Sequence, residues 1–167
     1  MQASVSRPRG EDDASGAQLT ARRLMLIIAV VALAGVAVSS VSLYHHFGTS
    51  RTSFCTFGQS FNCDIVNRSS YSTVFGVPVA LIGILGYLLI LALATVYREK
   101  AETPVMLLIA SAAGLGFALY LTYIEKFVLQ AWCILCLSSL LLIFIEVVLG
   151  GVLTATTLRR SWSNEQR

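Results

Sequence analysis

Long apolar stretches alternate with short polar segments along the chain, which is the pattern of a protein that crosses a membrane several times. Four of these stretches run for about 20 residues, the length that a helix needs to cross a hydrocarbon core about 30 Å thick. They cover approximately residues 24–44, 74–97, 105–124 and 131–153. The pattern predicts an all-α membrane protein, a four-helix transmembrane bundle that occupies residues 21–158.

The segments outside these stretches are polar. Residues 1–20 and 159–167 show no apolar periodicity, so we expect two cytoplasmic tails, the first of them disordered. The outer loop over residues 45–73 is the one sizeable connection, and we expect no soluble module at either end of the chain. Aromatic residues within this loop predict that it lies on the bundle, with a short interfacial helix near residues 64–67.

Composition excludes a soluble globular protein. Hydrophobic residues make up 56% of the 167 residues and charged residues 13%, whereas about a quarter of a soluble domain is charged. The net charge of +3 does not indicate nucleic acid as a partner, because no cluster of basic residues is interleaved with aromatic residues on a solvated surface.

The positions of the basic residues predict the orientation, because cytoplasmic flanks of membrane helices are enriched in Lys and Arg. Nine of the 12 lie on the side that carries both termini: Arg7, Arg9, Arg22, Arg23, Arg98, Lys100, Arg159, Arg160 and Arg167. We therefore expect both termini in the cytoplasm, in a bacterial plasma membrane rather than the endoplasmic reticulum. All four cysteines then face the outer compartment, where disulfides form and persist.

Cys133 and Cys136 are spaced as C-x-x-C at the start of the fourth stretch. Residues three apart share a helix face, and a cysteine at a helix N-terminus is favoured as the thiolate. Such a pair readily cycles between dithiol and disulfide. The alternatives are half of a zinc site or two inert cysteines. Zinc requires three or four ligands, and Cys55 and Cys63 lie too far apart in the sequence to make a good second half. We therefore predict a redox pair and no metal.

Cys55 and Cys63 lie in the outer loop, separated by seven residues. Their spacing alone allows two interpretations, a structural disulfide that clips the loop and a redox shuttle that exchanges with a partner. The C-x-x-C pair at the same membrane face favours the shuttle.

These features together resemble the vitamin K epoxide reductase family over most of residues 24–155. The resemblance rests on Cys55-x7-Cys63, the segment Cys63-Asp64-x-Val66-x-x-Ser69, Phe75-Gly76-Val77-Pro78, and Tyr120-Leu121-Thr122-Tyr123 ahead of Cys133-x-x-Cys136. Their order within four spans is specific, although no single motif is.

The resemblance implies a relay of electrons. Cys55 would take them from a reduced thioredoxin-fold protein, and Cys63 would pass them to Cys133 through a mixed disulfide. Cys136 would then react with a quinone of the ubiquinone, menaquinone or vitamin K type. Residues that match family positions around the quinone are Ser69, Ser72, Phe75 and Leu121.

Two departures resemble bacterial members more than animal ones. Leu140 stands where animal members carry a tyrosine that contacts vitamin K, and Ser72 where they carry an asparagine. Many bacterial members also carry a fused thioredoxin-like domain, which we do not find here, so we expect the partner to act in trans.

We therefore predict a membrane thiol-disulfide oxidoreductase that oxidises a secreted thioredoxin-fold partner, reduces a membrane quinone and supports disulfide-bond formation. Two alternatives remain open: reduction of vitamin K epoxide or quinone of the animal type, and a non-enzymatic membrane scaffold with a structural disulfide. Activity with epoxide or with quinone, and the effect of replacing Cys133 and Cys136, distinguish these possibilities.

Overall fold

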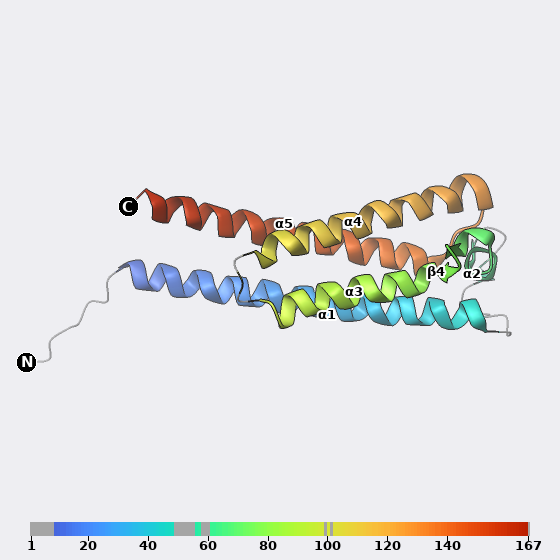
Figure 1. The fold of residues 1–167 in the computed structure, drawn as a ribbon, viewed down its shortest axis with the longest axis horizontal. Helices are drawn as coiled ribbons and strands as arrows, with labels where there is room; N and C mark the ends of the chain where they lie inside the picture. The colour runs from blue at the N-terminus through green and yellow to red at the C-terminus, as the bar shows by residue number, and fades with distance from the viewer. Residues whose placement is uncertain (1–8, 49–55, 58–60, 99, 101, 167) are drawn as a thin grey trace, which may run out of the picture.

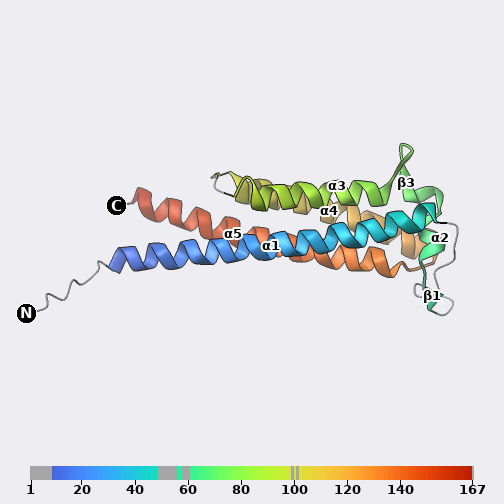
Figure 2. The same ribbon diagram turned by 90° about the horizontal axis from the view of Figure 1, so that it is seen from below.

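Four long helices run alongside one another and form a single elongated bundle (Figures 1 and 2). The structure is a computed structural model that describes residues 9–48, 56–57, 61–98, 100 and 102–166. The four helices are α1 (Arg9–Phe47), α3 (Val79–Thr95), α4 (Thr103–Ile124) and α5 (Ile134–Glu165). Helix α1 packs against α3 and α5, and α4 packs against α5 and α3. The start of α1 and the end of α5 lie at one end of the bundle.

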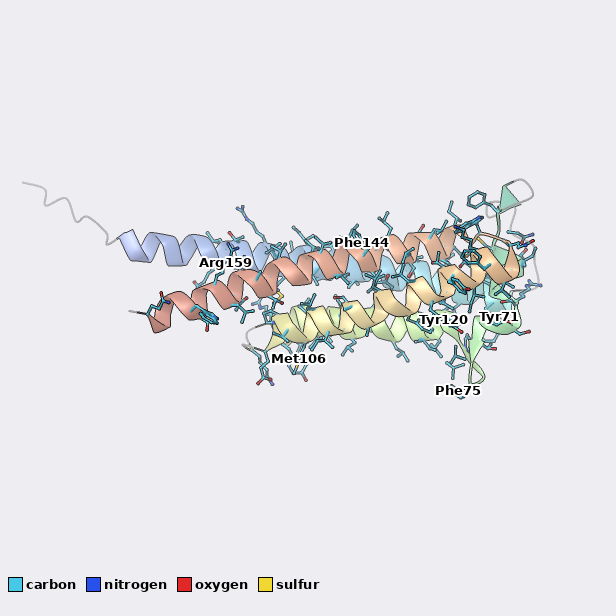
Figure 3. The ribbon with its side chains drawn as sticks, turned by 90° about the horizontal axis from the view of Figure 1, so that it is seen from above. Tyr71, Phe75, Met106, Tyr120, Phe144 and Arg159 are labelled. Carbon is cyan, nitrogen blue, oxygen red and sulfur yellow. The ribbon has the colours of Figure 1, made fainter. Side chains whose placement is uncertain are left out.

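The core of the bundle is built from side chains of all four long helices. Its buried members are Met25, Ile28, Ala32, Tyr87, Ile90, Leu93, Ala94, Leu107, Ile143 and Leu153. Large apolar side chains also cover the outside: Met106, Tyr120 and Phe144 are each about half exposed and project from the outer faces (Figure 3). An apolar exterior is stable only where lipid covers it.

The helices meet the requirements of membrane spans. Gln18–Phe47, Thr103–Leu129 and Ile134–Arg159 are long and apolar enough to cross a membrane, and the 17-residue α3 is a shorter apolar helix. Helices satisfy all their backbone hydrogen bonds internally, which hydrocarbon requires. The predicted all-α membrane bundle is confirmed.

The second apolar stretch begins with a β-hairpin instead of a helix. Strands β3 (Thr73–Val74) and β4 (Val77–Pro78) pair antiparallel, and α3 starts only at Val79. Phe75 and Gly76 form the turn with φ angles of 52° and 79°. A glycine that accepts a positive φ and a proline that lacks a backbone N–H account for this local departure from helix.

Two helices extend further than their apolar stretches. Residues 9–20 continue α1 and residues 159–165 continue α5, where the sequence suggested tails. Both segments contain Ala, Leu, Arg or Gln, and a helix that is already nucleated extends at little cost. Residues 1–8 of the expected N-terminal tail lie outside the described residues.

The opposite end of the bundle from the start of α1 carries the short elements (Figure 1). Strand β1 (Thr56–Phe57) pairs with β2 (Phe61–Asn62), followed by α2 (Cys63–Asn67) and the 3₁₀ turn η2 (Ser70–Ser72). A π-helical turn, η3 (Glu125–Leu129), extends α4 at the same end. Helix α2 corresponds to the short helix expected near residues 64–67.

Candidate active site

Cys63 is the first residue of α2 and is completely buried. The Asn62 side chain caps this helix by accepting a hydrogen bond from the Ile65 backbone N–H at 3.2 Å. Such a cap satisfies a backbone donor that the helix leaves unpaired. Cys63 is disulfide-bonded. Cys55, the other predicted cysteine of the outer loop, lies outside the described residues.

Cys133 and Cys136 carry free thiols at the start of α5. Cys133 is the N-cap, and its Sγ accepts a hydrogen bond from the Cys136 backbone N–H at 3.4 Å. Cys133 directly precedes the candidate span Ile134–Arg159. Hydrogen bonds from the Cys136 thiol and the Cys136 backbone lower the pKa of the Cys133 thiol, although its burial acts in the opposite direction. The geometry therefore favours a thiolate at Cys133.

A backbone contact brings the two cysteine-bearing segments together. The Asn62 N–H donates to the Trp132 carbonyl oxygen at 3.1 Å, and Phe61 forms a bridge with Trp132. These residues directly precede Cys63 and Cys133. The two cysteines accordingly belong to one buried cluster, which Val66 and Ala131 complete. Cys136 packs against this cluster.

Glu125 adds a buried carboxyl group to the thiol pair. It begins η3, is 2% exposed, and its Oε2 accepts a hydrogen bond from the Cys133 backbone N–H at 3.1 Å. Its Oε1 makes no hydrogen bond to any described residue. Gln130, with a φ of 51°, turns the chain so that the Ala131 N–H reaches the Glu125 carbonyl oxygen at 3.2 Å.

These three side chains lie close together but do not complete a structural metal site. One ligand atom each of Glu125, Cys133 and Cys136 lies within 4.8 Å of the others, the one such group among the described residues. Structural zinc sites use four ligands, so the set is one short of a closed site. A free dithiol beside a disulfide-bonded cysteine is the arrangement that thiol–disulfide exchange requires.

A small cavity of about 50 Å³ opens beside Cys136, lined mainly by residues of α2, η2, α3, α4 and η3. Three of the four predicted quinone residues, Ser69, Ser72 and Leu121, lie on its wall, together with Glu125 and Cys136. The Ser69 hydroxyl donates to the Val66 carbonyl oxygen at 2.8 Å, and the Ser72 hydroxyl to the Ser69 carbonyl oxygen at 2.7 Å. Both serines are therefore held in place by the local backbone.

Asn67 also lines this cavity and is 6% exposed. Its Oδ1 accepts a hydrogen bond from the Ser42 hydroxyl at 2.9 Å, and its carbonyl oxygen lies 2.6 Å from His46 Nδ1. The amide Nδ2, by contrast, has no partner among the described residues. An unpaired buried donor on a cavity wall is available to an oxygen of a ligand.

A larger cavity of about 390 Å³ continues from the thiols into the bundle. The two cavities share Val79, Ala80, Leu121 and Cys136 on their walls. The larger one is mainly apolar, lined by small and aliphatic residues of all four long helices together with Tyr87 and Phe117. Cys136 thus stands where a polar pocket meets an apolar one, which suits an amphipathic ligand.

Phe75 is the one predicted quinone residue that the fold does not bring to these cavities. It is fully exposed at the tip of the β3–β4 hairpin, which projects from the side of the bundle (Figure 3). It lines neither cavity at the thiols. In the described fold, Phe75 and Gly76 contribute the turn of the β3–β4 hairpin, and the Phe75 ring makes no part of either cavity.

Two residues of the site were not singled out from the sequence. Glu125 precedes Cys133 by eight residues in the sequence, close enough to reach it across a turn. Asn67 follows Cys63 by four residues, and this spacing puts both on one face of a helix. Both spacings can be read from the sequence. Neither of them reveals that the Glu125 carboxyl group and the Asn67 amide each keep a polar atom without a partner among the described residues.

Comparison with known families gives a match to the sequence model of the Vitamin K epoxide reductase family over residues 26–150. The matched range includes Cys63, Cys133 and Cys136, the residues that line both cavities, and most of the four long helices.

Proposed function

The chain belongs to the vitamin K epoxide reductase family, a family of oxidoreductases, and from this premise we propose its specific reaction. We propose that it oxidises a secreted thioredoxin-fold dithiol protein and passes the electrons through two cysteine pairs to a membrane quinone. The products are a disulfide in the partner protein and a quinol in the membrane. The reaction thereby supports disulfide-bond formation outside the cytoplasm.

One observation carries this proposal: the disulfide-bonded Cys63 and the free thiol of Cys133 lie in the same buried cluster. Thiol–disulfide exchange requires a thiolate in contact with a disulfide sulfur. The hydrogen bond between Asn62 and Trp132 fixes the two segments relative to each other. Cys55 is the proposed entry point from the partner, and Cys136 is the proposed exit to the quinone.

The two cavities support a quinone as the acceptor. A quinone has a polar head and, in membranes, an apolar tail, and bound beside Cys136 it supplies an acceptor of two electrons and two protons. The larger cavity is mainly apolar, whereas the smaller one carries the Asn67 amide, a donor without a partner among the described residues. Ser69, Ser72 and Leu121 are the proposed neighbours of the head group. These features do not select among ubiquinone, menaquinone and vitamin K.

The proposed location is a bacterial plasma membrane with both termini in the cytoplasm and the cysteines at the outer face. The start of α1 and the end of α5 at one end of the bundle support this orientation (Figure 2). Those ends carry most of the basic residues, which favour the cytoplasmic side. The partner then meets the loop elements in trans from the outer compartment.

The test is quinone reduction by the purified protein in lipid nanodiscs, supplied with a reduced thioredoxin-fold protein. We expect turnover in the wild type and none in Cys136→Ala, because that variant cannot form the inner disulfide. Cys133→Ala should also be inactive, with the outer pair trapped as a dithiol. Failure of the folded wild type to reduce any of the three quinone types refutes the proposal.

A further inference from the structure

Glu125 is a buried acid whose one hydrogen bond among the described residues does not require a charge. One carboxylate oxygen accepts the Cys133 N–H, and the other is buried without a hydrogen bond to any described residue. Leaving a buried polar atom unpaired is destabilising, and more so for a charged group. A glutamine would accept the same N–H without a charge, so the backbone contact alone does not explain an acid here.

The neighbours of Glu125 give the carboxyl group a chemical role. A carboxylate oxygen and the sulfurs of Cys133 and Cys136 lie within 4.8 Å of one another, a distance that one water or a small rotation bridges. The other titratable residues on the small cavity are His46, Tyr71 and Cys136. His46 Nδ1 lies 2.6 Å from the Asn67 carbonyl oxygen, whereas the Glu125 carboxylate is the group placed within 4.8 Å of both sulfurs.

We propose that Glu125 is the proton acceptor of the Cys133–Cys136 dithiol and the proton donor to the reduced quinone; this rests on the proposed function. Two S–H bonds break, one S–S bond forms, and the two electrons released pass to the quinone. The two protons leave the sulfurs one after the other through the Glu125 carboxylate. They form the two O–H bonds of the quinol, so atoms and electrons balance.

The position of Glu125 allows it both to accept a proton from the dithiol and to donate one to the reduced quinone. Glu125 and Cys136 line the same small cavity, so the group that takes a proton from the sulfur also faces the place proposed for the quinone head. Its 2% exposure keeps bulk water from that exchange. A general base within reach of its proton contributes about 100- to 10,000-fold to a reaction rate.

The test compares three variants in the nanodisc assay with a reduced thioredoxin-fold protein and a quinone. Glu125→Gln keeps an oxygen for the Cys133 N–H but removes the base, so we expect turnover to fall at least about 100-fold at neutral pH. Turnover should recover at alkaline pH, where the thiols ionise without help. Glu125→Asp, which keeps a carboxylate on a shorter side chain, should fall between Glu125→Gln and the wild type.

Glu146→Gln is the matched control. Glu146 is also 2% exposed and its Oε1 also lacks a partner among the described residues. It lies ten residues beyond Cys136 on α5, about 15 Å along the helix. The same substitution there should leave turnover within about twofold of the wild type. A loss in Glu146→Gln equal to that in Glu125→Gln would show a general effect of removing a buried acid and overturn the proposal.

A measurement without quinone separates the base from a structural role. The charge of Glu125 acts to raise the pKa of the Cys133 thiol, so its removal should move the alkylation midpoint of Cys133 to lower pH. Faster alkylation together with slower turnover is the signature of a lost proton acceptor. Turnover that stays low at every pH overturns the proposal.

The outcomes distinguish this proposal from the function on which it rests. A wild type without quinone reduction refutes the function itself. A wild type that turns over beside an equally active Glu125→Gln refutes only the role of Glu125. If Glu125→Gln does not fold, Glu125→Asp takes its place in the test. The proposal then requires that turnover of Glu125→Asp is reduced at neutral pH and recovers at alkaline pH. Turnover of Glu125→Asp equal to that of the wild type at every pH refutes the role of Glu125.

Discussion

Among the described glycines, Gly35 on α1 leaves the least room for a side chain, because the Tyr87 ring on α3 packs against it. Replacing Gly35 by alanine tests this helix contact by adding one methyl group. A Cβ added at Gly35 would lie 2.3–2.5 Å from three ring carbons of Tyr87. The Tyr87 side chain is 4% exposed, and its hydroxyl donates to the Ser139 carbonyl oxygen on α5 at 2.8 Å. Gly35→Ala therefore disturbs the contact among three helices at once.

The magnitude follows from these distances. Carbon atoms pack at about 3.5–4.0 Å, so the ring must move by more than about 1 Å. Overpacking of a buried site costs about 1–3 kcal/mol, and loss of the Tyr87 hydrogen bond about 1 kcal/mol more. Replacing a helical glycine by alanine returns about 1 kcal/mol. We expect Gly35→Ala to lower the free energy of unfolding by about 1–3 kcal/mol.

The assay is reversible unfolding in mixed micelles, followed by circular dichroism, for the wild type, Gly35→Ala and Gly116→Ala. Gly116 is the matched control because an added Cβ there meets nothing within 4 Å. It should be unchanged or up to about 1 kcal/mol more stable. Equal stability of the two variants, within about 0.5 kcal/mol, would refute the packing argument. Tyr87 also lines the larger cavity, so Gly35→Ala should raise the KM for quinone.

Three further predictions concern the site. In Cys136→Ala the Cys133 thiol loses its strongest hydrogen bond and its pKa rises, so alkylation of Cys133 by a small reagent should shift to higher pH; an unchanged midpoint contradicts this. Asn67→Leu removes from the small cavity an amide donor that has no partner among the described residues, and it should raise the KM for quinone about 2- to 12-fold; an unchanged KM contradicts this. Phe75→Gly should leave that KM within about twofold of the wild type, because the ring lies outside both cavities; a large increase would place it at the quinone.

The four helices could be predicted from hydropathy because the bilayer leaves the backbone few choices. Every N–H and C=O in hydrocarbon needs an internal partner, so a sufficiently long apolar stretch is a helix. The same reasoning fails at the ends of the stretches, where water and headgroups supply partners. There Gly76 and Pro78 turn an apolar segment into a hairpin, and α1 and α5 continue into polar sequence.

The candidate site was predictable where its chemistry is local in sequence. The C-x-x-C pair follows from its spacing, whereas Ser69, Ser72 and Leu121 were predicted from the family resemblance. The fold brings these three residues and Cys136 to one cavity. The place of Glu125 was not predictable in this way. It depends on a π-helical turn that shifts the register of the helix and on the positive φ of Gln130. Neither feature has a reliable signature in one sequence.

The electrostatics of Cys133 bear on the direction of the proposed relay. Electrons pass inward when a thiolate of the outer pair attacks the inner disulfide at Cys133 and the resulting mixed disulfide is then resolved by the second outer thiol. That resolution releases Cys133, and a thiol with a lower pKa is the better leaving group. The hydrogen bonds from Cys136 lower the pKa of Cys133 and so favour its release. The inner dithiol is then left beside the buried Glu125 and the cavity, where the proposed quinone can remove both electrons and protons.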